Sequence, residues 1–326
     1  MTFHSGNISN SNFLVTGGAG FIGSHIAEYL LKNGAAKVRV LDNMVNGFDS
    51  NLEILKIFPQ FEFILGDIRD LETCRQACDG IDYVSHQAAL GSVPRSIKDP
   101  VYFNDVNVDG FVNMLKAAVD NNVNKFVYAS SSAVYGDEPT LPKIENKLGN
   151  CLSPYAATKK INELYAQVFA DVYGLKTTGL RYFNIFGPRQ DPDGPYAAVI
   201  PLFVKVIINK TPVYINGDGE QTRDFTFVDN AVQVNIKAML TDNKDSVNKV
   251  YNVAVGENFS VNYLYNACAQ NLKSDWTATN REPRAGDIRN SLADISLAKN
   301  LLDYQPTKRF EDGLTETIEF FKHLYS

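Results

Sequence analysis

A tyrosine and a lysine four positions apart, Tyr155 and Lys159, are the side chains in this sequence best suited to proton transfer, and the serines Ser130, Ser131 and Ser132 precede them. If the segment around them is helical, the tyrosine and the lysine project from one face, and the ammonium can lower the pKa of the phenol. A phenol with a lowered pKa can exchange protons near neutral pH. Because this spacing also occurs by chance in many helices, the prediction depends on the elements that would position the pair.

A glycine-rich turn near the N-terminus indicates a nucleotide site. An apolar run over residues 13–16 leads into the turn, and a helical pattern follows it. Gly17 would permit a tight turn, Gly20 would let the backbone approach a pyrophosphate, and Gly23 would let the helix lie close to the strand. The N-terminus of that helix would then face the anion.

The next predicted strand, residues 37–42, ends in Asp42, which is placed to accept hydrogen bonds from the ribose of an adenosine. This carboxylate would repel a 2′-phosphate, and Asn43 beyond it offers no positive charge. The sequence therefore favours NAD over NADP. Arg39, earlier on the same strand, is expected to face outward or to pair with an acid.

Strands and helices alternate through the first half of the chain, which predicts an α/β protein with a parallel, doubly wound sheet. Ligands of such sheets bind beyond the carboxyl ends of the strands, where Gly17, Asp67, Ala88 and residues 130–132 should meet in one crevice. The regular alternation of strands and helices ends after the strand at 175–181, which predicts a smaller mixed domain in the second half of the chain. The other predicted strands are 61–66, 81–84, 125–129, 213–215 and 250–253, and the predicted helices are 68–78, 103–119, 155–173, 199–208 and 228–240.

Composition excludes several classes of protein. Hydrophobic residues make up 44% of the 326 residues and charged residues 21%, as in a soluble globular protein. The net charge of −6 argues against a nucleic-acid partner. The four cysteines lack the spacing of a metal site, so no metal is predicted, and no apolar run is long enough for a membrane span. We expect a cytoplasmic protein with reduced thiols.

Five motifs in this order resemble the extended short-chain dehydrogenase/reductase family: residues 16–23, 66–70, 86–89 and 130–136, and the pair Tyr155 and Lys159. The resemblance covers essentially the whole chain. It implies a Rossmann-like NAD-binding domain over residues 1–180, to which residues 222–253 return. It also implies a smaller mixed α/β C-terminal substrate domain over residues 181–326.

The same resemblance implies roles for individual residues. Tyr155 would be the acid and base, Lys159 would hold the nicotinamide ribose, and Ser131 would act beside the tyrosine. The residues implied to bind NAD are Gly17, Gly20, Phe21, Ile22, Gly23, Asp42, Asn43, Asp67, Ile68, Gln87, Ala88, Ala89, Asn107, Ser130, Tyr155, Lys159, Tyr182 and Phe183.

Within this family the chain resembles the sugar-nucleotide epimerases, in which two arginines, here Arg223 and Arg284, hold the diphosphate of a UDP-sugar. Residues 87–96, 190–201 and 291–294 resemble in particular the UDP-N-acetylglucosamine 4-epimerases of bacterial surface-polysaccharide pathways. The residues implied to bind substrate are Ser92, Ser131, Ser132, Tyr155, Asn184, Ala198, Val199, Tyr214, Asn216, Arg223, Arg284, Asp287 and Ser291.

Ser291 stands where the family resemblance implies a choice between sugars. A tyrosine at this position would exclude an N-acetyl group, whereas a hydroxymethyl group leaves space of the order of an acetamide. The resemblance therefore implies inversion at C4 of UDP-N-acetylglucosamine to UDP-N-acetylgalactosamine through a 4-keto sugar. Two other substrates stay open: UDP-glucose, and a UDP-N-acetylhexosaminuronate whose carboxylate would meet Arg95 or Arg189.

Elimination is disfavoured, because dehydratases and decarboxylases of this fold carry acids where Ser132 and Ala133 stand. A non-catalytic module that binds NAD or a nucleotide sugar is the alternative from another class. The presence of Ser131, Tyr155 and Lys159 together argues against this alternative, because a non-catalytic module would not need all three. The resemblance also implies a homodimer in which the helices at 103–119 and 155–173 pair across a two-fold axis.

Overall fold

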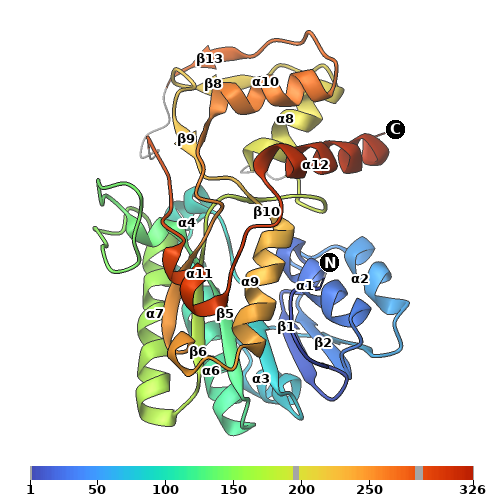
Figure 1. Cartoon of the computed structure of the whole chain (residues 1–326), viewed down its shortest axis with the longest axis vertical. Coiled ribbons are helices and arrows are strands. Elements are labelled where there is room, and N and C mark those ends of the chain that lie inside the picture. The colour runs from blue at the N-terminus through green and yellow to red at the C-terminus, as the bar shows by residue number, and fades with distance from the viewer. Residues whose placement is uncertain (1, 194–197, 283–288, 326) are drawn as a thin grey trace.

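The computed structural model describes residues 2–193, 198–282 and 289–325. A sheet of seven parallel strands forms the centre of the larger lobe, in the order β11-β6-β5-β4-β1-β2-β3 (Figure 1). This confirms the predicted doubly wound parallel sheet. The chain moves outward in one direction from β1 to β3 and in the other from β4 to β11, so a crevice opens between β1 and β4. The seven strands are β1 (Asn12–Thr16), β2 (Lys37–Asp42), β3 (Phe61–Leu65), β4 (Tyr83–His86), β5 (Lys125–Ser131), β6 (Thr177–Tyr182) and β11 (Lys249–Val253).

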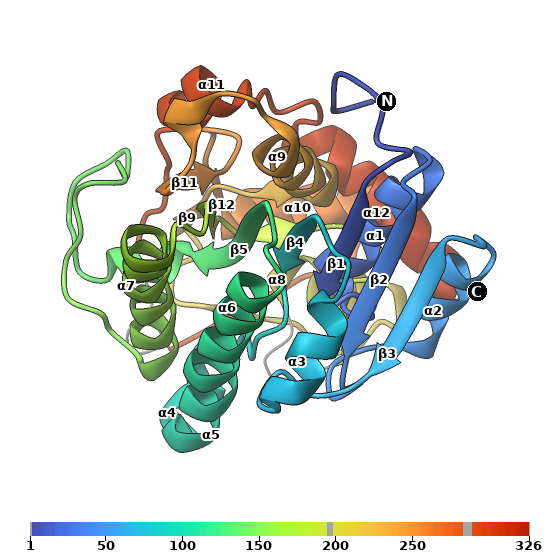
Figure 2. The ribbon, with the colours of Figure 1, turned by 90° about the horizontal axis from the view of Figure 1, so that it is seen from below.

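Helices cover both faces of the sheet (Figure 2). On one face α1 (Phe21–Lys32), α2 (Asp49–Lys56), α9 (Val228–Leu240) and α11 (Ser296–Leu302) bury side chains in one core. On the other face α3 (Leu71–Cys78), α6 (Gly110–Asp120) and α7 (Pro154–Tyr173) bury side chains in a second core. The short helices α4 (Val93–Lys98) and α5 (Pro100–Asn104) lead into this second layer.

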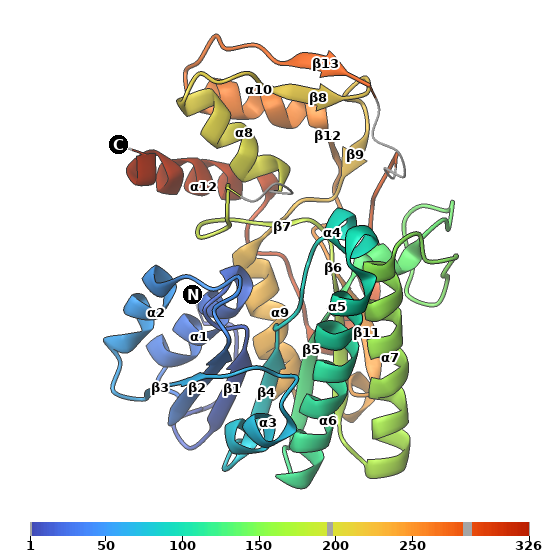
Figure 3. The same ribbon diagram turned by 180° about the vertical axis from the view of Figure 1, so that it is seen from behind.

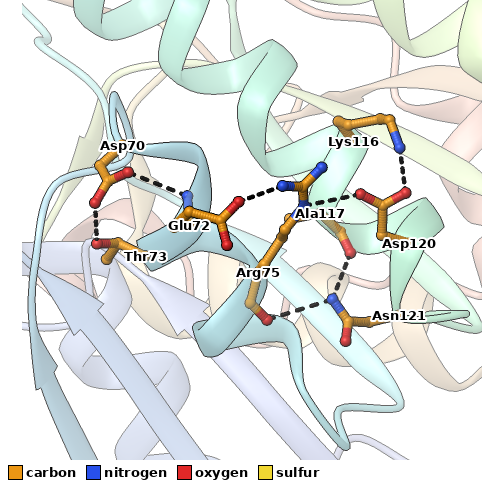
Figure 4. A network of polar contacts seen from close by, with 8 residues as sticks. All are labelled: Asp70, Glu72, Thr73, Arg75, Lys116, Ala117, Asp120 and Asn121. Carbon is orange, nitrogen blue, oxygen red and sulfur yellow. Dashed lines mark hydrogen bonds and ion pairs between the residues drawn. The ribbon is translucent and has the colours of Figure 1, made fainter.

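A surface network joins α3 to α6 (Figure 4). Arg75 donates to the carboxylate of Asp120 at 3.0 Å and also pairs with Glu72 on its own helix. Lys116 pairs with the same Asp120. Because exposed ion pairs contribute only about 0–1 kcal/mol each, the buried apolar side chains hold these two helices to the sheet.

The smaller lobe lies above the carboxyl ends of the strands (Figure 3). Its core contains side chains of three helices, α8 (Val199–Ile208), α10 (Val261–Asn271) and α12 (Phe310–Tyr325). Short strand pairs complete it. They are β7 (Ile185–Phe186) with β10 (Thr226–Phe227), β8 (Tyr214–Asn216) with β13 (Thr279–Arg281), and β9 (Thr222–Arg223) with β12 (Phe259–Ser260).

The helix predicted over residues 103–119 is present, as part of an unbroken helical run over residues 100–120 that includes one π-helical turn. The chain passes from α5 through a π-helical turn, Asp105–Asp109, into α6. Gly110, the first residue of α6, packs closely against Ile68. A Cβ atom at this position would lie 2.6 Å from Cγ1 of Ile68, so a larger residue would clash there. Helices α2, α10, α11 and α12 were not predicted at all.

Candidate functional site

A cavity of about 640 Å³ lies at the carboxyl ends of β1, β2, β4 and β5, below the smaller lobe. Its volume is in the range of cofactor and small-molecule sites. Most of the site residues predicted from the sequence line it. They are Gly17, Gly20, Phe21, Ile22, Gly23, Asp42, Asn43, Ile68, Gln87, Ala88, Ala89, Ser92, Ser130, Ser131, Ser132, Tyr155, Lys159, Tyr182, Asn184 and Ala198.

Three residues predicted to bind NAD lie outside the cavity wall. Phe183 is completely buried in the core, because it follows Tyr182 at the end of a strand where successive side chains point to opposite faces. Asn107 is buried behind the wall, where its amide bonds both the N–H and the carbonyl of Leu90. Asp67 forms an ion pair with Arg69.

The predicted residues for the uridine diphosphate and the N-acetyl group are on the smaller lobe and its connections. Tyr214 and Asn216 are on β8, Arg223 is on β9, and Val199 begins α8. These four residues and Ser291, which is 9% exposed, lie outside the cavity wall. The predictions for Arg284 and Asp287 lie outside the described residues.

The glycine turn has the close packing that a bound pyrophosphate requires. Gly17 has φ = +68°, and a Cβ atom there would lie 2.7 Å from the backbone nitrogen of Ala88. A Cβ atom at Gly23 would lie 2.2 Å from the carbonyl oxygen of Gly17. Gly20 is the N-cap of α1, and no side chain caps that helix. The free N–H groups of α1 are therefore available to an anion, and the turn fits a dinucleotide.

Asp42 ends β2 on the cavity wall, and its side chain is held from two sides. One carboxylate oxygen accepts the N–H of Ala19 at 3.0 Å, and the other accepts the N–H of Met44 at 2.9 Å. Burial raises the pKa of this carboxyl. Each oxygen keeps a second lone pair, so the residue can still accept hydrogen bonds from a ribose.

Arg39 points away from the cavity. Its guanidinium pairs with Glu62 at 3.0 Å and donates to the carbonyls of Ala77 and Asp79 at 2.9 Å and 2.8 Å. It therefore faces an acid, as predicted, and cannot receive a 2′-phosphate.

Helix α7 presents the predicted acid–base pair to the cavity. Ser153 caps the helix by accepting the N–H of Ala156 at 3.1 Å, and a proline occupies the first turn. The ammonium of Lys159 donates to the carbonyl of Ala129 on β5 at 2.9 Å. Burial lowers the pKa of Lys159 to about 8.

The predicted lowering of the pKa of Tyr155 is wrong for this arrangement. Burial raises the pKa of the phenol, and a hydrogen bond with Ser131 only partly opposes this. The ammonium of Lys159 donates one hydrogen bond to the carbonyl of Ala129, which leaves two of its three N–H donors for other partners. The phenol is neutral at physiological pH.

The serines at the end of β5 have different partners. The hydroxyl of Ser131 accepts the N–H of Ala133 at 3.1 Å and begins a 3₁₀ turn, Ser132–Tyr135. The hydroxyl of Ser130 donates to the buried carboxylate of Glu163 at 2.7 Å. Ser131 is thus the serine in contact with the phenol of Tyr155.

Sequence reasoning missed several residues that shape the cavity. Asn235 on α9 donates to the hydroxyl of Tyr182 at 2.7 Å, and that hydroxyl donates to Gln87 at 3.0 Å. Val45 and Phe48 line the wall in the loop after Asp42. No motif marks these residues, and only the contacts between distant segments reveal them.

Among the described residues, no cluster of three or more histidine, cysteine, aspartate or glutamate side chains could hold a metal ion. Within the same residues, no helix has the length and apolar character needed to cross a membrane.

Comparison with known proteins gives matches over nearly the whole chain. UDP-N-acetylglucosamine 4-epimerase from Methanobrevibacter ruminantium M1, in complex with UDP-N-acetylmuramic acid, is 40% identical with a TM-score of 0.91, covering 96% of this chain and 99% of that one. A putative UDP-glucose 4-epimerase from Methanocaldococcus jannaschii is 36% identical, over 95% of this chain and 98% of its own length. A UDP-glucuronate 4-epimerase from Thermodesulfobacterium geofontis is 33% identical, over 95% and 96%.

These three relatives are named for different UDP-sugars, so the likeness identifies the family and leaves the sugar open. The model of the NAD dependent epimerase/dehydratase family matches residues 13–254. With the glycine turn, Asp42 and the pair on α7 on one cavity wall, the chain belongs to the NAD dependent epimerase/dehydratase family, and NAD is its cofactor.

Proposed function

We propose that the protein is a cytoplasmic UDP-N-acetylglucosamine 4-epimerase that interconverts UDP-N-acetylglucosamine and UDP-N-acetylgalactosamine for surface-polysaccharide synthesis. The observation that carries the proposal is the placement of Ser131, Tyr155 and Lys159 on one cavity wall, together with the absence of a carboxylate at Ser132 and Ala133. The first group can transfer the proton that oxidation and reduction of C4 by NAD require, whereas Ser132 and Ala133 lack the base that elimination requires.

In the proposed reaction Tyr155 removes the proton of the sugar 4-hydroxyl and later returns a proton to the 4-oxygen. NAD, held by the glycine turn and Asp42, would supply the hydride chemistry at C4, with the hydride returned to the opposite face of the sugar, and its positive charge would favour the phenolate of Tyr155. Ser131 donates a hydrogen bond to the 4-oxygen, and Lys159 binds the nicotinamide ribose. Because the ketone formed in the first half is reduced in the second, no external oxidant or reductant is consumed.

The UDP group must stay bound while the keto sugar turns over. We assign this to Arg223 and Arg284 on the diphosphate, helped by Asn184, and to Tyr214, Asn216 and Asp287 on the uridine. Ser291 would admit the N-acetyl group because it is small.

Proton NMR of purified protein with UDP-N-acetylglucosamine, without added NAD, tests the proposal. The C4 epimer should accumulate to an equilibrium mixture, and the Tyr155→Phe variant should form it at least about a hundredfold more slowly. A panel with UDP-glucose and the UDP-N-acetylhexosaminuronates identifies the preferred sugar. No inversion with any member of the panel would contradict the assignment.

A UDP-N-acetylhexosaminuronate is the second candidate substrate, and Arg95 is the observation that favours it. Arg95 lines the cavity, and its guanidinium has no hydrogen-bond or ion-pair partner among the described residues. Helix α4 carries it beside α7, where the hydroxyl of Ser96 accepts the N–H of Tyr155 at 3.1 Å. Arg189 is less suitable, because it pairs with Glu28 and donates to Ser24 at 3.2 Å. Arg95→Gln should reduce turnover of the uronate selectively if this substrate is the natural one.

We also propose that the protein is a homodimer that pairs through α7. The outward face of this helix carries Leu164, Val168 and Val172, which are 58%, 49% and 66% exposed. An apolar stripe of this kind fits a second copy of the same helix. Val168→Glu should convert a dimer to a monomer in sedimentation, whereas Ile57→Glu, at a 75% exposed residue just after α2, should not.

A further inference from the structure

A short strap, defined as residues 289–294, connects the smaller lobe to helix α11 beside the sheet (Figure 1). One edge of the strap pairs with β9. The N–H of Thr222 donates to the carbonyl of Arg289 at 2.9 Å, and the N–H of Ser291 donates to the carbonyl of Thr222 at 3.1 Å. The strap therefore places Ser291 directly opposite the strand that carries Arg223.

Asp224, the residue after β9, ties this strap to the sheet. One oxygen of its fully buried carboxylate accepts the N–H of Val255 at 3.0 Å. The other accepts the N–H groups of Gly256 at 3.1 Å and of Ala293 at 3.3 Å. Val255 and Gly256 follow the edge strand β11, whereas Ala293 belongs to the strap. Burying a carboxylate without hydrogen-bond donors costs free energy, so all three hydrogen bonds are needed. Together they form a joint, in which one carboxylate links the strap to the end of β11.

Asn252 on β11 holds the strap from a second side. Its amide donates to the carbonyl of Asp294, within the strap, and to the carbonyl of Lys143, both at 2.9 Å. The backbone of Lys143 in turn accepts the N–H of Asp294 at 2.9 Å. Two buried side chains therefore fix the strap to the carboxyl end of β11.

Asp224 also connects to the cavity wall. Its backbone carbonyl accepts a hydrogen bond of 3.2 Å from the amide of Asn184, which lines the cavity. One residue thus contacts the wall, the strap and the end of the sheet. Arg223, the residue before Asp224, is assigned above to the diphosphate of the UDP-sugar. Ser291, on the strap, is assigned to its N-acetyl group.

We infer that Asp224 is a positioning residue for the nucleotide sugar. It fixes the position of the strap relative to Arg223, so that Ser291 and Arg223 can contact the same ligand. This inference rests on the proposed function, because it takes a UDP-sugar as that ligand. Asp224 itself is fully buried and acts only through the backbone groups that it bonds.

The Asp224→Asn variant tests this inference without a change of volume. Its amide nitrogen must face at least one N–H donor, so the joint loses hydrogen bonds. Hydrogen exchange in a peptide that covers the strap should accelerate about tenfold or more. The Kd for UDP-N-acetylglucosamine, measured by calorimetry, should rise about tenfold. The amount of co-purified NAD should not change.

Asn230→Ala is the matched control. Asn230 is also fully buried, and its side chain bonds Thr307 and Lys308 in a segment that none of the strap contacts above involves. This variant should lower Tm, yet leave strap exchange and the Kd for UDP-N-acetylglucosamine as in the wild type. If Asp224 only stabilised the fold, Asp224→Asn would behave like Asn230→Ala, with a lower Tm but unchanged strap exchange and an unchanged Kd for UDP-N-acetylglucosamine.

Unchanged strap exchange in Asp224→Asn would overturn the inference, and so would faster exchange with an unchanged Kd. A loss of NAD in proportion to the loss of sugar binding would also overturn it, because the effect would then be general. If Asp224→Asn does not fold, Asn252→Ser removes the hydrogen bonds on the second side and is read in the same way. Wild-type protein that binds UDP-N-acetylglucosamine but does not invert C4 would contradict the proposed function alone.

Discussion

The hydroxyl of Ser130 donates a hydrogen bond of 2.7 Å to the carboxylate of Glu163, which ties the end of β5 to helix α7. The same carboxylate pairs with the buried guanidinium of Arg181 on β6 at 2.8 Å. Ser131 follows on the strand and Tyr155 precedes on the helix. Ser131 and Tyr155, the proposed catalytic residues, are thus positioned by elements that share one buried ion pair.

Glu163→Gln should lower the free energy of unfolding by about 3–5 kcal/mol, because it leaves the charge of Arg181 buried without an opposite charge. Chemical denaturation measures this loss. Glu319→Gln removes an exposed partner of Lys322 and should cost less than about 1 kcal/mol. Similar small losses in both variants would show that the buried pair does not carry this stability.

Gly17→Ala should abolish the retention of NAD. The new Cβ atom would lie 2.7 Å from the backbone of Ala88, in a residue with φ = +68°, so the turn must shift where the pyrophosphate would bind. NAD released from the purified protein by acid can be quantified. Gly34→Ala is the control, because Gly34 has φ = +79° but nothing within 4 Å of the added atom. Equal NAD content in both variants would contradict the prediction.

Lys159→Met should stabilise the protein while it abolishes turnover. The pKa of Lys159 is lowered from 10.5 to about 8 by burial, so the folded state binds fewer protons than the unfolded state between these two values. The stability of the wild type should therefore rise as pH increases through this window. Below pH 8 the variant avoids the buried charge, and its Tm should exceed that of the wild type by a few degrees.

Thermal melts of both proteins between pH 6 and pH 10 measure the difference in Tm. The difference should be largest below pH 8 and should shrink toward pH 10. A constant difference across this range would show that Lys159 does not titrate as described.

Ser291→Tyr should abolish turnover of N-acetylated sugars and retain turnover of UDP-glucose. Because Ser291 is 9% exposed, we expect an aromatic ring there to leave the strap and occupy the space of the acetamide. Kinetics with UDP-N-acetylglucosamine and UDP-glucose measure the ratio of kcat/KM, and Ser291→Ala should leave this ratio unchanged. An equal loss on both sugars would count against the role of Ser291.

The sheet and the cofactor end of the site could be predicted because each βα unit is local in the sequence. The turn after β1 carries its own glycines, and Asp42 ends the very next strand. In the smaller lobe the helix at 199–208 and the strand at 213–215 were predicted and are present as α8 and β8. The pairing of its strands could not be predicted, because they are short and join distant segments. Tyr214 on β8, for example, pairs with Thr279 on β13.

The surroundings of two site residues could not be inferred from sequence spacing. Tyr182 and Phe183 were both assigned to NAD; neighbouring side chains at the end of a strand face opposite sides, so the side chain of Phe183 is in the core, and its contact with NAD stays a prediction. The pKa of Tyr155 was expected to be lowered because of its spacing to Lys159, but burial of the phenol raises it. Spacing places side chains on one face of a helix and does not give their partners.

The fate of the hydrogen at C4 tests the central claim most directly. UDP-N-acetylglucosamine deuterated at C4 should give UDP-N-acetylgalactosamine that keeps the deuterium at C4 in ordinary water, because the hydride is taken up and returned without contact with solvent. Mass spectrometry and proton NMR read this result. Product with ordinary hydrogen at C4, or no product at all, would contradict the account.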